Sequence, residues 1–153
     1  MGTLLENKTA LVTGASRGTG RQIALTLAAE GAYVVVNYNG SADAANAVVE
    51  QIKANGGDGE AYQCTVSDFA AVEEMIKTLV KKLGRIDILV NNAGITRDDL
   101  LMKMKEADFD AVIATNLKGS FNTMRHMARP MLKQKGGCVI NISSVSGILG
   151  NPG

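Results

Sequence analysis

Residues 13–20 read Thr-Gly-Ala-Ser-Arg-Gly-Thr-Gly and directly follow the short apolar run Ala10-Leu11-Val12. Three glycines spaced four and two residues apart, between an apolar run and a helical pattern, are typical of a phosphate-binding turn. Gly14 permits a tight exit from a strand, and Gly18 and Gly20 let a helix N-terminus approach an anion with no side chain between them. Free N–H groups and the helix dipole then attract the anion. The stretch indicates a dinucleotide ligand and an α/β fold.

The glycine spacing, G-x-x-x-G-x-G, differs from the common G-x-G-x-x-G fingerprint, and a glycine-rich turn by itself is a weak signal. Its position between the first apolar run and the first helical pattern strengthens the interpretation. The turn is not a P-loop, because neither Lys-Ser nor Lys-Thr follows it.

Short runs rich in Val and Ile alternate with amphipathic stretches along the whole chain. Runs without polar alternation are typical of strands buried on both faces of a parallel sheet. The predicted strands are residues 9–13, 33–38, 60–64, 86–90 and 138–142. Helices are predicted at Asp43–Lys53, at Phe69–Leu83 and from about Phe109 to Lys133, and the glycines at 31, 56–57, 84 and 136–137 are expected to end helices. Residues 143–153 are expected to form a loop with no following helix.

Repeated strand–helix–strand units give right-handed crossovers and an open parallel sheet. The predicted fold class is α/β, a doubly wound parallel sheet or Rossmann fold, with strand order 3-2-1-4-5. Ligands bind outside the carboxyl ends of strands at the switch point, so the loops after Thr13 and Val90 should converge on one site. We expect one dinucleotide-binding domain over residues 1–153, truncated after the fifth strand and incomplete at its C-terminus.

Composition places few limits on function. The 153 residues are 46% apolar and 20% charged, which is ordinary for a globular domain, and the net charge of +1 gives no argument for binding nucleic acid or an anionic membrane. With no apolar run of membrane-spanning length and no basic, apolar leader, a cytoplasmic location is expected. Cys64 and Cys138 share no metal-ligand spacing; we expect reduced, buried thiols and no metal site.

The end of the second predicted strand bears on the choice of cofactor. It reads Asn37-Tyr38-Asn39, without the acidic residue that would bind a ribose 2′-hydroxyl and repel a 2′-phosphate. Arg17 in the glycine turn offers a bidentate fork for that phosphate. The presence of Arg17 together with the lack of an acidic residue at positions 37–39 favours NADP(H) over NAD(H). The alternative is that Arg17 is a solvated surface residue.

Residues 91–94, Asn-Asn-Ala-Gly, follow the fourth predicted strand at the switch point. Small and amide side chains there would let a nucleoside lie against the backbone while Asn92 hydrogen-bonds loop groups. The alternative is a plain Asn-rich turn.

Several motifs along the whole chain resemble those of the short-chain dehydrogenase/reductase family and occur in the same order. They are Thr13-Gly14…Gly18…Gly20, residues 91–94, Asn116 and Ser143-Ser144. More narrowly, residues 92–98, Asn-Ala-Gly-Ile-Thr-Arg-Asp, with Leu100 and Met104, are similar to 3-oxoacyl-[acyl-carrier-protein] reductases of fatty-acid synthesis. The resemblance implies an oxidoreductase that uses NADPH to reduce a 3-oxoacyl group on acyl carrier protein to a 3-hydroxyacyl group. It also implies a homo-oligomer, a tetramer in the complete enzyme.

The resemblance implies roles for individual residues. Asn116 would hold a water in a proton relay, and Ser144 would hydrogen-bond the substrate carbonyl; the alternatives are a satisfied helix-interior amide and a loop hydroxyl. Thr65 and Val66 would lie near adenine, and Thr19, in place of the usual aliphatic residue, is expected to loosen packing beneath the turn. The implied cofactor-binding residues are Gly14, Ala15, Ser16, Arg17, Gly18, Thr19, Gly20, Asn39, Thr65, Val66, Asn92, Ala93 and Gly94.

The family also implies a Tyr-x-x-x-Lys pair about a dozen residues after Ser144, where the phenol protonates the carbonyl oxygen and the lysine lowers the pKa of that phenol. No tyrosine in this sequence fits: the residues four positions after Tyr33, Tyr38 and Tyr62 are Asn37, Ala42 and Val66. We therefore expect the chain as given to be catalytically silent, with weak nucleotide binding retained. We also expect it to expose an apolar patch through which it self-associates.

Other interpretations remain open. The chain is alternatively a nucleotide-binding module without catalysis, a short-chain enzyme for another carbonyl or alcohol, or a structural fragment. Arg129, Lys133 and Lys135 are expected at the substrate end of the long helix, where they would dock an acidic carrier protein or simply form a solvated helix terminus. His126 is expected to be a surface or interface residue.

Overall fold

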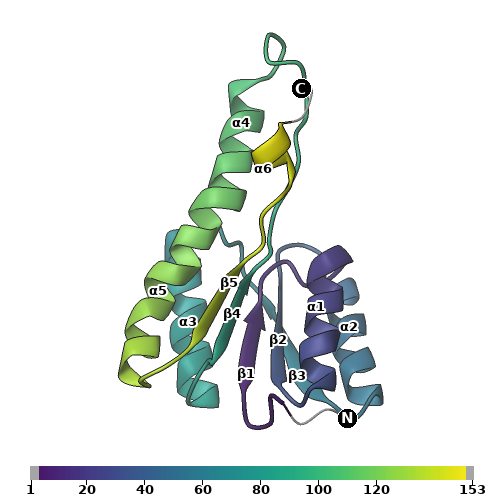
Figure 1. Cartoon of the computed structure of the whole chain (residues 1–153), viewed down its shortest axis with the longest axis vertical. Coiled ribbons are helices and arrows are strands. Elements are labelled where there is room, and N and C mark those ends of the chain that lie inside the picture. The colour runs from purple at the N-terminus through teal and green to yellow at the C-terminus, as the bar shows by residue number, and fades with distance from the viewer. Residues whose placement is uncertain (1–3, 151–153) are drawn as a thin grey trace.

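Five parallel strands form a single sheet in the computed structural model, which describes residues 4–150 (Figure 1). Their order, β3-β2-β1-β4-β5, confirms the predicted doubly wound α/β fold, with the switch point between β1 and β4. The strands are β1 (Thr9–Val12), β2 (Tyr33–Tyr38), β3 (Asp58–Gln63), β4 (Ile88–Asn91) and β5 (Cys138–Asn141).

Helices cover both faces of the sheet (Figure 1). On one face lie α1 (Gly18–Ala29) and α2 (Ala42–Ala54), and on the other α3 (Phe69–Leu83) and α5 (Gly119–Lys133). The segments α4 (Glu106–Val112) and η1 (Ile113–Lys118, a π-helix) run directly into α5, so that one helical column rises past the carboxyl ends of the strands. No helix within residues 4–150 is long and apolar enough to cross a membrane.

The central strands are apolar on both faces because each face has its own core. In β1, Ala10 and Val12 pack into the cluster beneath α1 and α2, whereas Leu11 packs into the cluster beneath α3 and α5. All three side chains are fully buried. This alternation explains why the strand signal is a continuous apolar run rather than a period of two.

Helix α3 shows how local signals set an element's bounds. The Asp68 carboxylate accepts a hydrogen bond from the Ala71 amide at 3.0 Å and caps the first turn. Val72, Met75, Ile76 and Leu79 then form the buried stripe, and the helix ends at Gly84, whose φ of 80° lies in the left-handed region. The predicted bounds of this helix agree with the structure.

The edge strands differ from the prediction. All residues of β5 are exposed and β3 is only partly buried, because each strand has a neighbour on one side only within the described residues. Cys138, at the start of β5, is exposed, so its predicted burial is wrong. Cys64 is buried as expected, but it follows β3 instead of lying in it, and burial raises the pKa of its thiol to about 11.

Two further differences concern helices. A short helix, α6 (Ser146–Leu149), lies in the segment expected to be a loop, and the last three residues of that segment, 151–153, lie outside the described residues. At the end of α5 the residue in the left-handed region is Lys135, with φ 58°, rather than a glycine of the pair at 136–137. That pair therefore does not provide the left-handed helix end that the sequence predicts.

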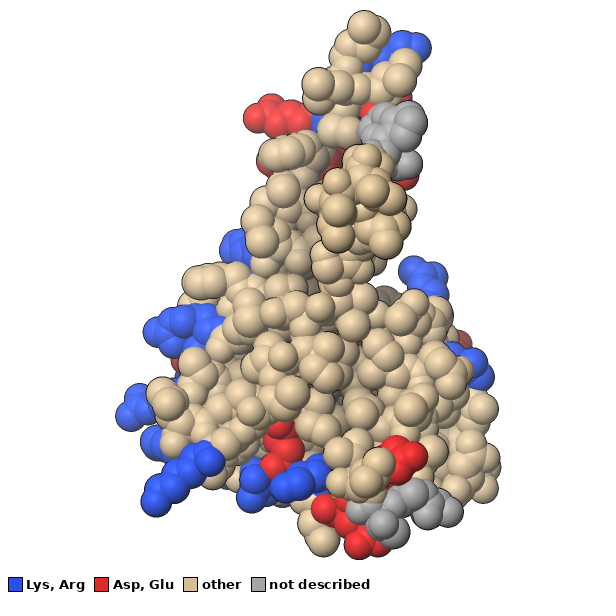
Figure 2. Space-filling model, viewed as in Figure 1, with Lys and Arg blue, Asp and Glu red and all other residues tan. Residues whose placement is uncertain are grey.

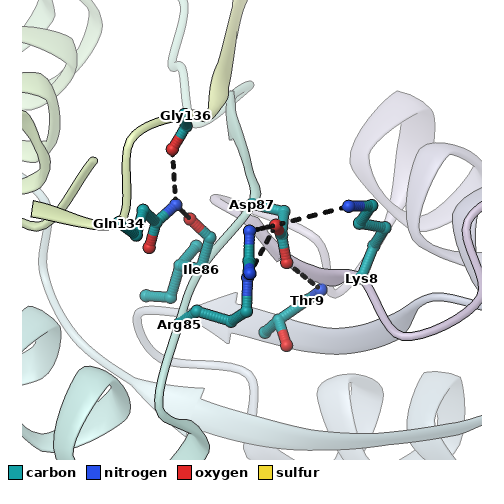
Figure 3. Close-up of polar contacts among 7 residues, drawn as sticks. All are labelled: Lys8, Thr9, Arg85, Ile86, Asp87, Gln134 and Gly136. Atoms are coloured by element: carbon teal, nitrogen blue, oxygen red, sulfur yellow. Dashed lines mark hydrogen bonds and ion pairs between the residues drawn. The ribbon is translucent and has the colours of Figure 1, made fainter. Parts of the chain in front are cut away.

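Polar contacts tie the amino ends of the central strands to the end of α5 (Figure 3). The buried Asp87 carboxylate accepts hydrogen bonds from the Thr9 amide at 3.0 Å and from Arg85 Nε at 2.9 Å. Gln134 donates from Nε2 to the carbonyl of Ile86 at 2.8 Å. These contacts hold the amino edge together, and two cavities that share lining residues open at the opposite edge of the sheet.

Candidate dinucleotide site

Two cavities, of about 620 and 640 Å³, open at the carboxyl edge of the sheet. The first lies between the turn after β1 and the ends of β2 and β3; the second lies between the turn after β4, η1 and the loop after β5. Arg17, residues 92–95 and Arg97 line both cavities, so the two share a wall. The predicted convergence of the loops after Thr13 and Val90 is confirmed.

The glycine turn has the geometry that its sequence requires. Gly14 and Gly18 have φ values of 61° and 58°, where other residues are strained. A Cβ on Gly14 would lie 2.8 Å from Cα of Ala93, and one on Gly20 would lie 2.5 Å from the carbonyl oxygen of Gly14. Helix α1 begins at Gly18, and its N-terminal N–H groups receive no side-chain cap from Arg17. Thr19 and Gly20 of this first turn line the first cavity, where free N–H groups would attract an anion.

Hydrogen bonds fasten this turn to the segment after β4. Thr13 Oγ1 accepts from the amides of Asn92 and Ala93, both at 3.0 Å. The Asn92 side chain donates from Nδ2 to the carbonyls of Thr13 at 2.9 Å and Gly14 at 3.2 Å. Asn92 thus holds the two switch-point loops together, as expected from the residues.

The side chain of Asn37 also connects neighbouring strand ends by hydrogen bonds, and the sequence did not lead us to include it among the site residues. Its buried side chain accepts from the Gly14 amide at 3.4 Å and donates from Nδ2 to the carbonyls of Cys64 at 3.0 Å and Tyr62 at 3.3 Å. The ends of β1, β2 and β3 are joined through this one amide. The available signal was a single asparagine directly after the apolar Val34-Val35-Val36, in a strand whose four central residues are buried.

The first cavity is polar and carries positive charge. Arg17 and Asn39 line it together with Thr65 and Val66, and Thr65 Oγ1 donates to the Asn39 side chain. Arg97 also lines it, and no Asp or Glu side chain of the described residues does so. Such a lining suits an anionic group better than a free ribose hydroxyl pair.

The second cavity brings Asn116 and Ser144 together. Asn116 lies in the π-helical segment, and its amide pairs with the backbone of Ile95 in both directions, at 2.9 Å each. The Ser144 Oγ accepts from the Ser146 amide at 3.2 Å, which leaves its own proton available to donate. π-Helical turns occur often at functional sites, and this one was not expected from the sequence.

Most of the residues implied to bind cofactor line the first cavity. Ala15 does not: its side chain is fully buried in the core beneath the turn. Gly18 lies outside the lining, and Thr19 is exposed and lines the cavity, so it does not loosen packing beneath the turn as expected. The residues that do line it are Gly14, Ser16, Arg17, Thr19, Gly20, Asn39, Thr65, Val66, Asn92, Ala93 and Gly94. Lining residues that the prediction missed include Tyr38, Arg97 and Thr115.

The predicted position of the basic cluster is wrong. Helix α5 runs from the cavity edge toward the amino end of β5, so Arg129, Lys133 and Lys135 lie at the far end from the cavities (Figure 1). The crossover from β4 to the parallel strand β5 requires this direction.

The family model for short chain dehydrogenases matches residues 8–153. The chain belongs to the short chain dehydrogenase family. It is 59% identical over 146 residues to the 3-oxoacyl-[acyl-carrier-protein] reductase FabG of Staphylococcus aureus strain Mu50, which covers 95% of this chain and 59% of that protein. A 3-oxoacyl-[acyl-carrier-protein] reductase of Synechocystis is 55% identical over 151 residues, 99% of this chain and 61% of that protein.

Among solved structures, a short chain dehydrogenase from Mycobacterium avium superimposes with a TM-score of 0.91 and 42% identity, covering 98% of this chain and 57% of that one. The chain therefore spans about 60% of the length of the curated short chain dehydrogenases it matches. Both the predicted family and the predicted fold are confirmed, including the narrower likeness to 3-oxoacyl-[acyl-carrier-protein] reductases.

Proposed function

We propose that this chain is the dinucleotide-binding part of a reductase that uses NADPH to convert 3-oxoacyl-[acyl-carrier-protein] to 3-hydroxyacyl-[acyl-carrier-protein] in fatty-acid synthesis. The observation that carries the proposal is the shared wall at residues 92–95: a glycine turn lies on one side of it, and Asn116 and Ser144 lie on the other. The named activities of the Staphylococcus and Synechocystis relatives support the substrate class.

The choice of NADP(H) rests on Arg17. A guanidinium binds a phosphate bidentately, and the cavity lining includes no carboxylate among the described residues to repel a 2′-phosphate. We expect Arg17→Ala to weaken NADP⁺ binding to the chain by about 1.5–3 kcal/mol, the scale of a hydrogen bond to a charged group, and to leave NAD⁺ binding nearly unchanged. Isothermal titration calorimetry measures both.

Arg21→Ala is the matched control for Arg17→Ala. Arg21 is an exposed arginine on α1 that donates to Gln51 at 2.6 Å and does not line the cavity. An equal loss of both cofactors in Arg17→Ala, or the same NADP⁺ loss in Arg21→Ala, would show that Arg17 does not recognise the 2′-phosphate.

Bound NADPH would supply the hydride that reduces C3 of the 3-oxoacyl group. In the second cavity, the Ser144 hydroxyl would donate a hydrogen bond to the C3 carbonyl oxygen as negative charge develops on it. Asn116, anchored by Ile95, would hold the water of a proton relay. Arg97 lines the same cavity and, with Arg17, favours an anionic substrate.

The substrate class is tested with a chimera that joins residues 1–153 to the remaining C-terminal part of the S. aureus relative. We expect reduction of an acetoacetyl thioester with NADPH, and we expect Ser144→Ala to lower kcat by about 10²-fold, as for loss of one oxyanion donor. Oxidation of secondary alcohols with NAD⁺, with the thioester ignored, would show that the enzyme acts on another substrate.

We further propose that residues 1–153 belong to one Rossmann domain and that the chain alone is catalytically silent. No tyrosine of this sequence has a lysine four positions later, and general acid catalysis contributes about 10²–10⁴-fold. Turnover of NADPH by the isolated chain above background would contradict this.

Self-association belongs to the same proposal. Phe109, Leu117 and Phe121 are each more than half exposed along the helical column, an apolar face that favours a homo-oligomer. Light scattering measures the mass, and a monomer would count against it. Carrier-protein docking by Arg129, Lys133 and Lys135 and a cytoplasmic location stay predictions.

A nucleotide-binding module without catalysis is the second candidate. The glycine turn and the first cavity would bind a nucleotide without any catalytic residue, which favours it. The chimera separates the two: a module would bind NADP⁺ with the affinity of the isolated chain and would not reduce any carbonyl, and Ser144→Ala would have no effect on it.

A further inference from the structure

Helix α5 buries two adjacent polar side chains near its start. Asn122 and Thr123 are fully buried, and neither lines one of the two cavities at the carboxyl edge of the sheet. One turn further on, the same face of α5 buries Met127, as an amphipathic helix normally does. A buried hydroxyl or amide costs free energy unless it is hydrogen-bonded, so the partners of Asn122 and Thr123 show what these residues contribute.

The Thr123 hydroxyl begins a chain of hydrogen bonds that leads to the loop after β5. It donates to Oδ1 of the buried Asn91 at 2.6 Å, and Asn91 donates from Nδ2 to Oδ1 of Asn141 at 2.8 Å. The backbone continues the connection, because the amide of Ile142 donates to the carbonyl of Asn91 at 2.9 Å. Ser144 follows two residues later and lines the second cavity. One hydroxyl on α5 is thus linked to the segment that carries Ser144.

The same turn of α5 also contacts the π-helical segment. Ser120 Oγ donates to the carbonyl of Asn116 at 3.2 Å. The carbonyls of Gly119 and Ser120 lie 3.2 and 2.9 Å from Thr123 Oγ1. A π-helix closes its hydrogen bonds one residue further along than an α-helix, so the change from η1 to α5 at Gly119 disturbs the backbone ladder. The hydroxyls of Ser120 and Thr123 lie where they bond the carbonyls of this transition.

The orientation of the Asn91 amide depends on Thr123. A threonine hydroxyl has a single proton, and of the three oxygens within its reach Asn91 Oδ1 is the closest. Among the described residues, no other group donates to that oxygen. β5 and α6 contain no charged residue, and Figure 2 shows an uncharged surface over them, so no ion of these elements competes for the amides of Asn91 and Asn141. Without the hydroxyl, nothing would fix which way the Asn91 amide points.

We propose that Thr123 is a positioning residue for the second cavity, because through Asn91 it holds the loop that carries Ser144. Together with Ser120, it also holds the π-helical turn that carries Asn116. Thr123 acts only through these neighbours, in the way that buried hydrogen bonds behind a site lock the side chains in front of them. The effect on catalysis rests on the proposed reductase function, whereas the effect on the loop is a property of the chain itself.

Asn122 supports the other cavity and provides an internal comparison. Its Nδ2 donates to the carbonyl of Val66 at 2.8 Å, and Val66 lines the first cavity. A Cβ on Gly119 would lie 2.7 Å from Cγ2 of Val66, so α5 approaches this loop closely. A change at Asn122 should therefore act on nucleotide binding, whereas a change at Thr123 should act on the reaction step.

Hydrogen exchange of the 153-residue chain tests the effect on the loop directly. Thr123→Val removes the hydroxyl and keeps the shape of the side chain, and Thr123→Ser keeps the hydroxyl. We expect residues 142–146 to exchange about tenfold faster in Thr123→Val, the effect of about 1.4 kcal/mol on a local opening equilibrium. Thr123→Ser should exchange at the original rate. Thr26→Val makes the same chemical change at an exposed position on α1 and is the matched control.

Kinetics test the effect on the reaction, in the chimera that joins residues 1–153 to the C-terminal part of the S. aureus relative. Thr123→Val should lower kcat by about tenfold, less than the roughly 10²-fold that a misplacement of about 1 Å costs, and should leave KM for NADPH unchanged. Thr123→Ser should restore kcat. Asn122→Leu should give the opposite result, a higher KM for NADPH with kcat unchanged.

The two experiments separate this inference from the proposed function. An unsubstituted chimera without reductase activity would refute the proposed function, and the exchange rates would still decide whether Thr123 holds the loop. An active chimera with the same kcat in Thr123→Val would overturn the inference. An equal rise of exchange in every element would overturn it too, because it would show a role in stability alone. Should Thr123→Val fail to fold, as judged by far-UV circular dichroism, Thr123→Ala and Thr123→Ser make the same comparison with smaller side chains.

Discussion

Replacing Asn37 with leucine tests whether one buried amide holds three strand ends in place. The change keeps the number and branching of the side-chain heavy atoms but removes the acceptor for the Gly14 amide at 3.4 Å and the donor to Cys64 and Tyr62 at 3.0 and 3.3 Å. A buried polar group left without its partner costs about 1–3 kcal/mol. Because only the Cys64 contact is short, we expect the free energy of unfolding to fall by about 2–4 kcal/mol in total.

Urea unfolding of the chain, followed by far-UV circular dichroism, measures this loss. With an m value of about 2 kcal/mol/M, the middle of the usual range, the midpoint should fall by about 1–2 M while m stays unchanged. Asn46→Leu makes the same chemical change at an exposed position on α2 and is the matched control. A midpoint for Asn37→Leu no lower than that of Asn46→Leu would refute the reasoning. Asn37→Asp should destabilise as well, since it turns a carboxylate oxygen toward the carbonyl oxygen of Cys64.

Four other expectations concern stability and reactivity. Asp87→Ala should lower the free energy of unfolding by about 1–3 kcal/mol, because the Asp87 carboxylate is the buried acceptor at the amino ends of β1 and β4. The control in the same urea assay is Glu50→Ala, which removes an exposed carboxylate. Asp68→Ala removes the N-cap of α3 and should cost about 1 kcal/mol, with hydrogen exchange accelerated first in residues 69–72. Burial raises the pKa of the Cys64 thiol from 9.0 to about 11. The contribution of the protonated thiol to stability is therefore complete below pH 9 and is lost as the pH rises toward 11. A Cys64→Ala variant should lack this dependence of the free energy of unfolding on pH. Below pH 9, iodoacetamide should label the exposed Cys138 quickly and Cys64 only after unfolding, a contrast that mass spectrometry checks.

The parallel, two-sided sheet followed from the sequence because the central strands are apolar on both faces, and the strand order followed from the repeated strand–helix–strand units. In Val34-Val35-Val36 the first and third side chains lie in one core and the second lies in the other, which leaves a continuous apolar run that a two-sided sheet explains. The same reasoning was wrong for β5, which is equally apolar but lies at an edge, with all four residues exposed. Position within a sheet is a property of the whole fold, and the local pattern of Cys138–Asn141 contains no information about it.

The site was predicted where its residues form a motif that is contiguous in sequence. The glycine turn and residues 91–94 are such motifs, so Asn92 was predicted even though its side chain bonds the carbonyls of Thr13 and Gly14, 79 and 78 residues away. The π-helical segment around Asn116 was missed because it is coupled to the pairing of that side chain with Ile95, 21 residues away. Asn37 was missed because no motif surrounds it and its partners Cys64 and Gly14 are 27 and 23 residues distant.

These contacts make the segment after β4 the part on which the whole site depends. On one side, Asn92 and Ala93 are bonded to Thr13, which fixes the glycine turn. On the other side, Ile95 is bonded to Asn116, which fixes the second cavity. A shift of this short segment would therefore move the turn and the reactive side chains relative to each other, and hydride transfer depends on such alignment to within an ångström. The backbone of residues 92–95, more than any single side chain, sets the geometry that the proposed reaction needs.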